Sequence, residues 1–119
     1  MDLKQLDIVL CEFYFSNLNK SKKRPVLVFK DNLPYDDFIA IPISSKIDNL
    51  KEDELLIDNS DFEDGNIKKD SKLMIRKVFV VSKNVVVKKY GTLKTESFKK
   101  YHSNFCEYFQ CNLGIIGEK

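Results

Sequence analysis

The stretch DIVLCEFYFSNLNKSKKRPVLVFK, from Asp7 to Lys30, decides the fold of this chain. Two apolar segments, 7–15 and 25–30, are typical of β-strands and flank a polar loop that ends in Lys22-Lys23-Arg24-Pro25. Pro25 fixes its own φ and favours an extended backbone at Arg24. Arginine keeps its charge at any working pH and can bind phosphate through two parallel hydrogen bonds. The sequence therefore places a permanent cation at one point beside a small sheet.

Length and composition favour one folded domain. The 119 residues suit a single domain, 1–119, and a composition of 43% hydrophobic and 32% charged residues is typical of globular protein. Every apolar run is shorter than the about 18 residues of a membrane span, and the start, MDLKQLD, is too polar for a signal peptide. We therefore expect a cytoplasmic protein with no membrane partner.

The net charge of +2 hides an uneven distribution. Acidic residues dominate 48–64, whereas lysine and arginine gather in 20–30 and 68–100. Basic segments in a nearly neutral chain are compatible with a local site for a polyanion, and equally with an ordinary solvated surface. Within the acidic stretch, the acids of 58–64 lack the spacing of an EF-hand calcium loop, and we expect this part to be a solvated loop.

The remaining patterns predict a mainly β fold. Further strands are expected over 37–43, 54–58, 71–81 and 85–90, with a polar loop over 59–70. Pro42 suggests an edge or a bulge near the end of the third strand. Aromatic residues at helical spacing then predict a helix over 96–112 that packs on the sheet, with Thr95 as N-cap and Gly114 after its end. Short strands and one terminal helix indicate a small, strongly bent antiparallel sheet or barrel.

No motif for a metal, a nucleotide or a His-based catalytic triad occurs in the sequence. Cys11, Cys106 and Cys111 match no zinc or redox spacing and are interpreted as free thiols. His102, the only histidine, is expected on the helix surface. We therefore expect neither a metal nor a cofactor.

The candidate chemistry lies at Arg24 and in the segment Ile41-Pro42-Ile43-Ser44-Ser45-Lys46, which ends a strand with two hydroxyls and a lysine. If the second and third strands pair in antiparallel fashion, the start of one lies beside the end of the other, which places Arg24 near Ser44. Ordinary turn chemistry is the alternative role for the two serines.

These segments also resemble a known family. DIVLCEFYF and KKRPVLVF, followed by DFIAIPISS, look like the MazF/PemK toxin ribonucleases of toxin–antitoxin modules, and RKVFVVSKNVVVKKYGTL with a terminal helix is similar to the family's second half. The resemblance covers about 7–112. Arg-Pro opening one hydrophobic strand and Pro-x-Ser/Thr ending the next are together fairly specific.

The resemblance implies a compact SH3-like barrel with a C-terminal helix, usually a homodimer. It also implies a metal-independent endoribonuclease that cuts single-stranded RNA with the ribose 2′-OH as nucleophile. The family's catalytic arginine and threonine fall on Arg24 and Ser44. Because arginine is a poor base at neutral pH, Arg24 is expected to stabilise charge, and the proton acceptor stays open. A cognate antitoxin with an acidic segment is the implied protein partner.

Two departures from the family pattern affect these expectations. The glycine that commonly precedes the first strand is Leu6 here, and the loop SNLNKSKK contains no glycine. Serine replaces threonine at position 44, which keeps the hydroxyl. The loop change bears on which RNA sequence is cut.

Further residues are candidates for RNA binding. Loop lysines suit phosphates, although solvated surface lysines are the alternative, and aromatic rings near the loop can stack on bases or belong to the core. The set is Tyr14, Phe15, Lys20, Lys22, Lys23, Ser45, Lys46, Arg76 and Lys77.

Two other functions fit the same residues. One is a toxin that resembles CcdB and acts on DNA gyrase, whose activity would depend more on the terminal helix than on Arg24. The other is a module that binds RNA or a partner chain without catalysis. RNA cleavage that is lost in Arg24→Ala separates the ribonuclease from both.

Overall fold

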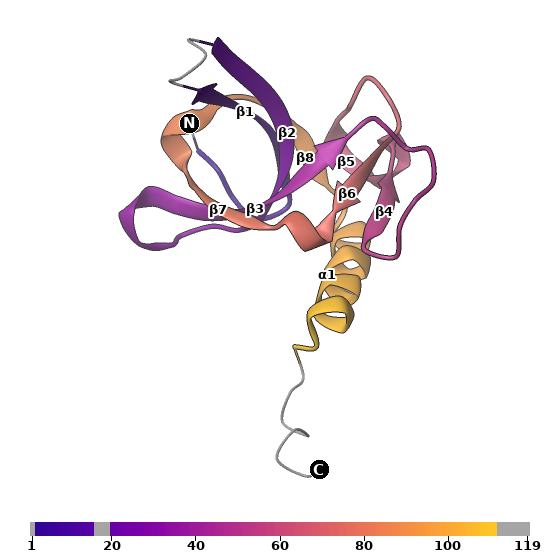
Figure 1. The fold of residues 1–119 in the computed structure, drawn as a ribbon. Coiled ribbons are helices and arrows are strands. Elements are labelled where there is room, and N and C mark those ends of the chain that lie inside the picture. The colour runs from indigo at the N-terminus through magenta and orange to yellow at the C-terminus, as the bar shows by residue number, and fades with distance from the viewer. Residues whose placement is uncertain (1, 16–19, 112–119) are drawn as a thin grey trace.

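Residues 2–15 and 20–111 are described by a computed structural model, in which a curled antiparallel sheet carries one C-terminal helix (Figure 1). Eight strands of these residues form the sheet in the order β4-β6-β3-β2-β1-β8-β5, and β7 also pairs with β3. The strands are β1 (Asp7–Phe15), β2 (Lys20–Lys30), β3 (Asp37–Ser44), β4 (Glu54–Ile57), β5 (Phe62–Gly65), β6 (Ser71–Met74), β7 (Phe79–Ser82) and β8 (Val86–Leu93). Short 3-10 turns are η1 (Pro34–Asp36), η2 (Asn59–Asp61), η3 (Ile75–Lys77) and η4 (Lys83–Val85), and the helix α1 spans Thr95–Phe109. The mainly β fold with a strongly bent sheet and a C-terminal helix is confirmed.

The centre of the sheet is buried on both of its faces. Alternate residues of the central strands point to opposite sides, and each side packs into a hydrophobic cluster. On one side Ile8, Leu27 and Ile41 belong to a core cluster that includes Phe98 and Tyr101 of α1. On the other side a second cluster forms. Its buried members are Leu3, Val9, Cys11, Val26, Val28, Phe38 and Ala40. The central strands are therefore apolar on both faces, unlike those of a sheet with one solvated side.

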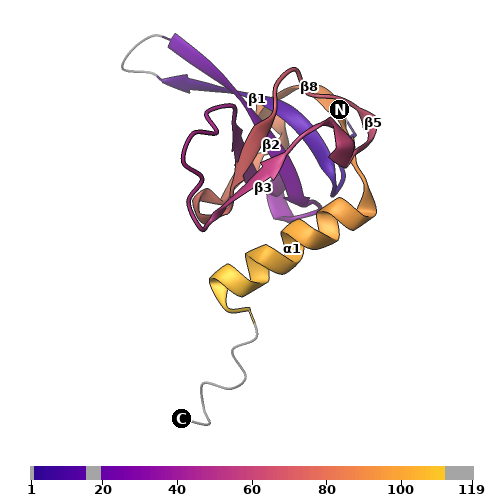
Figure 2. The ribbon, with the colours of Figure 1, turned by 90° about the vertical axis from the view of Figure 1, so that its right-hand side faces the viewer.

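The helix packs on the sheet through only part of its aromatic stripe. Phe98 and Tyr101 are buried, whereas Tyr108 and Phe109 are exposed. In Figures 1 and 2 the last turn of α1 points away from the sheet. The predicted N-cap is wrong by one residue, since Lys94 is the N-cap. The predicted end at Asn112 and the predicted Gly114 lie outside the described residues; the described helix ends at Phe109, after which Gln110 is left-handed.

Three strand predictions need correction. β2 begins at Lys20, because the loop lysines pair with β1 and prolong the ribbon. The polar loop over 59–70 contains β5, which pairs with β8. The long strand over 71–81 is interrupted by η3, so that β6 and β7 pair with different parts of β3. Pro42 lies between these two stretches of pairing, which agrees with the expected irregularity near the end of β3.

Leu6 occupies the position of the family's glycine in a conformation that glycine favours. Its φ is 83°, in the left-handed region that costs most side chains about 1 kcal/mol or more. The backbone there is fixed from both sides, since Leu6 N–H donates to Val28 O at 3.1 Å and Leu93 N–H donates to Leu6 O at 2.9 Å. The side chain packs against the larger core cluster. Packing thus offsets the strain, and the turn before β1 is kept without glycine.

The acidic segment 58–64, predicted to be a solvated loop, contains η2 and most of β5, although Glu63 and Asp64 are exposed. Acidic residues just before this segment form ion pairs. Asp53 is buried and lies 3.7 Å from Arg76. The carboxylate of Glu54 lies 3.0 Å from the Lys72 ammonium, and both side chains are largely shielded from solvent. The hydrogen bonds of Glu54 to the Lys51 backbone and to Lys72 lower the pKa of its carboxyl. Much of the acidic charge therefore serves the fold.

The three cysteines are free thiols, as expected. Cys11 is buried in the second cluster, and burial raises the pKa of its thiol to about 11. His102 is exposed on α1 and stacks on Phe29, with ring centroids 5.7 Å apart. No helix among residues 2–15 and 20–111 is long and apolar enough to cross a membrane.

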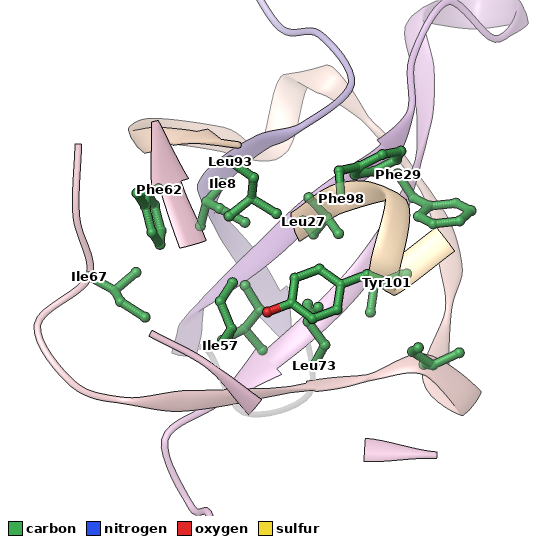
Figure 3. Packing of buried hydrophobic residues seen from close by; sticks show 13 residues of the cluster. Ile8, Leu27, Phe29, Ile57, Phe62, Ile67, Leu73, Leu93, Phe98 and Tyr101 are labelled. Carbon is green, nitrogen blue, oxygen red and sulfur yellow. The ribbon is translucent and has the colours of Figure 1, made fainter. Parts of the chain in front are cut away.

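Tyr101 joins the helix to the strands by its hydroxyl, and we expect its loss to be measurable. The side chain is fully buried among Ile57 and Leu73 (Figure 3), and its hydroxyl lies 2.8 Å from Leu56 O and 3.0 Å from an Asp61 carboxylate oxygen. Tyr101→Phe leaves these acceptors without that donor and should lower the free energy of unfolding by about 1–2 kcal/mol.

Urea unfolding followed by circular dichroism measures this difference. Tyr35→Phe is the control, because the Tyr35 side chain is 92% exposed. Equal midpoints for the two variants would show that the buried hydroxyl does not stabilise the fold.

Candidate active site

The strands β2 and β3 separate at a defined point along their length. Their pairing ends at Val26–Pro42, after which β3 pairs with β6 through Ile43 and Ser44 while β2 continues along β1. Pro25 and Pro42 both lack the backbone N–H with which a strand residue donates to its neighbour. An opening, hereafter the strand split, therefore separates the first half of β2 from the end of β3.

Arg24 and Ser44 lie on the two sides of this split. Each is two residues beyond the last pair, Val26–Pro42, so that the register, continued by two residues, places them opposite each other. Because side chains two apart on a strand share a face, Arg24, Val26, Pro42 and Ser44 belong to the same side of the sheet. Because the last pair of β2 and β3 is Val26–Pro42, the proximity of Arg24 and Ser44 stays a prediction.

Arg24 lines a cavity of about 330 Å³ on this face, hereafter the Arg24 cavity. Buried Val26 and Pro42 belong to its wall, and the rings of Phe13 and Phe79 pack there with centroids 6.0 Å apart. Its lining residues are Phe13, Arg24, Val26, Pro42, Met74, Lys77 and Phe79. The cavity thus combines an apolar wall with two cationic side chains.

These two cations are not neutralised by carboxylates in the described part of the chain. The ion pairs there involve Lys72, Arg76 and Lys89, and neither Arg24 nor Lys77. Arg24 and Lys77 are both exposed to solvent. A charge beside an apolar wall is screened less than one fully in water, so the cavity favours an anion that carries a flat or apolar group.

The Ser44 hydroxyl accepts a hydrogen bond within the turn after β3 and keeps its own proton available for donation. Its oxygen accepts a hydrogen bond from the Lys46 backbone N–H at 3.1 Å, which is the turn role considered for this residue. A hydroxyl that accepts one bond can still donate its own proton. Ser44 can therefore close the turn and still donate a hydrogen bond, and its donation to an anion at Arg24 stays a prediction.

Ser45 and Lys46 separate from this pair. Ser45 follows Ser44 and lines another cavity, of about 300 Å³, together with Pro25 and Ile43. Pro25 and Ile43 belong to the opposite face of the sheet from Arg24 and Pro42. Lys46 is exposed in the turn after β3. Neither Ser44 nor Ser45 is among the residues that line the Arg24 cavity.

Arg76 and Lys77, both predicted to bind RNA, have different surroundings. Both belong to the turn η3 rather than to a continuous strand. Lys77 lines the Arg24 cavity, whereas Arg76 lies 3.7 Å from the buried Asp53 carboxylate. Lys77 therefore belongs to the candidate site, whereas Arg76 forms an ion pair with Asp53.

The loop lysines lie on both faces of the ribbon formed by β1 and β2. Arg24 pairs with Cys11, and Lys22 pairs with Phe13. Because residues two apart on a strand share a face, Lys20, Lys22 and Arg24 lie on the same face of the ribbon. The ribbon projects beyond the curl of the sheet (Figure 2). The projecting ribbon therefore extends the positive face of the Arg24 cavity.

The opposite face of the ribbon carries Lys23 and Tyr14. The Glu12 carboxylate there accepts hydrogen bonds from Ser21 Oγ at 2.8 Å and from the Tyr14 hydroxyl at 3.2 Å. The hydrogen bond to this carboxylate raises the pKa of Tyr14, whose side chain is 77% exposed. Phe15 ends β1 opposite Lys20, and its predicted role in stacking stays a prediction. Tyr14 and Lys23 thus do not face the Arg24 cavity.

Sequence reasoning missed the apolar wall of the cavity. Phe13 could have been assigned to it, because strand alternation places Phe13 on the side of Cys11, whose partner is Arg24. Met74 and Phe79 are brought there by the interruption at η3, which no residue pattern announces.

Comparison with known proteins agrees with the fold described above. Residues 4–109 match the family of PemK-like, MazF-like toxins of type II toxin–antitoxin systems. No curated protein matches the sequence. The Mycobacterium tuberculosis toxin MazF-mt6 has a similar structure, with a TM-score of 0.65, 14% identity, and 87% of this chain and 96% of that one covered.

Two further structures come from mycobacterial species. An endoribonuclease in complex with its cognate antitoxin gives a TM-score of 0.70 at 10% identity, covering 92% of this chain and 96% of that one. A second endoribonuclease gives 0.66 at 11% identity, covering 91% of each chain. At these identities the structural likeness concerns the fold, and the family model extends over nearly all of the chain. The chain therefore belongs to the PemK-like, MazF-like toxin family of type II toxin–antitoxin systems.

Proposed function

We propose that the protein is an endoribonuclease toxin that cleaves single-stranded RNA at Arg24 without a metal ion. The observation that carries this proposal is that Arg24, which has no carboxylate partner among the described residues, lines a cavity beside the point where β2 and β3 separate. Ser44 lies two residues beyond that point on β3. Family membership supports it, as do the two similar structures described as endoribonucleases.

In the proposed reaction the ribose 2′-oxygen attacks the adjacent phosphorus, and the bond from phosphorus to the 5′-oxygen breaks. The proton of the 2′-OH passes to a base, and the leaving 5′-oxygen gains a proton. The products are a 2′,3′-cyclic phosphate and a 5′-hydroxyl. Negative charge grows on the non-bridging oxygens, where the Arg24 guanidinium and the Ser44 hydroxyl would donate hydrogen bonds. The nucleophile belongs to the substrate, so the protein has no need to activate a water molecule.

The other cations would hold the RNA on either side of this phosphate. Lys22 and Lys20 continue the face of Arg24 along β2, and Lys77 lies across the cavity. Each would contact a phosphate, and Phe13 or Phe79 would pack against a base. Lys23, Tyr14 and Lys46 are proposed as outer contacts only, because they lie away from the cavity.

We also propose a cognate antitoxin as partner, a homodimer as the assembled state, and action in the cytoplasm. The antitoxin is supported by the family and by the similar endoribonuclease that is described in complex with its own antitoxin. An acidic antitoxin segment would complement the cations of the Arg24 cavity.

Arg24→Ala should lower the rate of RNA cleavage about 10²–10³-fold, because the variant loses the main donor to the charged transition state. The cleavage rate of Arg24→Lys should lie between those of the wild type and Arg24→Ala. Lysine keeps the positive charge but cannot donate two parallel hydrogen bonds. Cleavage of a long single-stranded RNA in excess chelator, read on a sequencing gel, measures these rates, and 5′-hydroxyl ends identify the reaction.

Lys30→Ala is the matched control, since Lys30 is exposed at the far end of the same strand. Cleavage that requires a divalent metal, or that survives Arg24→Ala unchanged, would contradict the proposal. An intact RNA together with altered gyrase supercoiling would favour a gyrase-directed toxin. Salt-sensitive binding without products would favour a binding module.

Ser44 variants separate a catalytic hydroxyl from a turn residue. Ser44→Ala should reduce kcat about 10–100-fold, the range expected for a hydrogen bond to a charged group. Ser44→Thr keeps the hydroxyl and should retain most of the activity. Single-turnover cleavage at saturating RNA compares them. Equal activity of the alanine and threonine variants would assign the hydroxyl to the turn alone.

A further inference from the structure

The cavity that contains Ser45 lies at the same strand split as the Arg24 cavity, on the other side of the sheet. Residues 24 and 25 are consecutive on β2, and Arg24 lines one cavity while Pro25 lines the other. On β3, Pro42 lines the Arg24 cavity and the next residue, Ile43, lines the second cavity. The two cavities therefore lie beside the split at adjacent residues of both strands.

This second cavity, hereafter the Lys69 cavity, has a volume of about 300 Å³. Pro25, Ile43 and the buried Ile67 give it an apolar wall, and the half-buried Tyr90 adds an aromatic ring. A volume of this size lies at the small end of ligand pockets, which suits a single base or nucleotide.

Its rim is cationic. Lys68 and Lys69 line the cavity and are exposed, and neither belongs to an ion pair among residues 2–15 and 20–111. A third cation is near, since Lys88 Nζ lies 5.3 Å from the centre of the Tyr90 ring. An aromatic ring bordered by lysines is the combination with which proteins bind single-stranded nucleic acid.

The segment that carries the two lysines is fixed at both ends. Ile67 N–H donates to the Asn59 side chain at 2.8 Å, and Asn66 N–H donates to Tyr90 O at 3.3 Å. On the other side Ser71 Oγ donates to Lys69 O at 2.9 Å. The lysines therefore stand on a segment ordered before any ligand binds, which lowers the entropic cost of binding.

Close approach of two strands makes this arrangement possible. Gly65 has a φ of 80°, and a Cβ there would lie 2.1 Å from Tyr90 O. Only glycine lets β5 come this near to β8 before the chain turns toward Lys68. The position of the cationic segment next to Tyr90 thus depends on the backbone.

We propose that the Lys69 cavity is a second RNA subsite, which binds the base and phosphate of a nucleotide next to the one cleaved at Arg24. This inference rests on the proposed ribonuclease function. Tyr90 and the apolar wall receive the base, Lys68 and Lys69 receive phosphate, and the exposed Ser45 hydroxyl can donate to either. Contact with a base makes the subsite a determinant of the RNA sequence that is cut.

Two variants test the subsite with a pool of single-stranded RNA of randomised sequence. The double variant Lys68→Ala/Lys69→Ala should raise KM and reduce the slope of log affinity against log salt by about 1.4, or about 0.7 for each lysine that no longer neutralises a phosphate. Tyr90→Leu keeps an apolar side chain without the ring and should alter the preferred base at one position of the cleavage motif. Sequencing of the product ends reads this motif.

The control is Lys30→Ala/Lys99→Ala, which removes the same charge at exposed positions outside both cavities. Unchanged KM, salt slope and motif in both test variants, with an active wild type, would overturn the subsite and leave the ribonuclease proposal intact. If Tyr90→Leu fails to fold, the lysine variant alone decides, because both of its side chains are exposed.

Failure of the ribonuclease proposal gives a different result. If the wild type does not cleave, binding of the same RNA pool to Arg24→Ala, with and without the two lysine substitutions, still decides the subsite. Weaker binding after the lysines are removed supports it, and equal binding overturns it. Unchanged RNA binding with weaker binding of an acidic antitoxin peptide would make the cavity a protein-docking surface, which also overturns the proposal.

Discussion

The end of the pairing between β2 and β3 is the constraint on which the site depends. At Val26–Pro42, β3 leaves β2 for β6, and prolines stand on both strands where they separate. A sheet paired throughout would fill this space with hydrogen bonds and leave no room for a ligand. The parting exposes Arg24 and Ser44 on one face and Pro25 on the other. One interruption of backbone pairing thus creates both cavities.

The charge of the molecule is distributed by the fold rather than by the composition. Acidic residues of 48–64 supply partners to other cations: Asp53 to Arg76, and Glu54 to Lys72. Asp61 is held by the hydroxyls of Tyr101 and Ser97. A chain of net charge +2 therefore keeps Arg24 and its neighbouring lysines available to a polyanion. Surface composition alone understates this local field.

The sequence predicted the central strands because their apolar runs are long and their alternation is clear. Arg24 and Ser44 followed from antiparallel pairing together with the family resemblance. The different surroundings of sequence neighbours were harder to predict: Ser45 lines the other cavity, and Arg76 pairs with Asp53 although Lys77 lines the Arg24 cavity. The Lys69 cavity escaped prediction because it joins residues of β2, β3, β8 and the segment before β6, which are far apart in the chain. Tertiary pairing, rather than local pattern, brings them together.

The most direct measurement is an experimental structure of the protein with a single-stranded RNA that carries a 2′-deoxyribose at the cleavage position. Without the 2′-OH this RNA can bind but cannot react. The expected result is a phosphate held between the Arg24 guanidinium and the Ser44 hydroxyl, with the RNA crossing the strand split. A phosphate bound elsewhere, with the split empty, would contradict the assignment of the active site to the parting of β2 and β3.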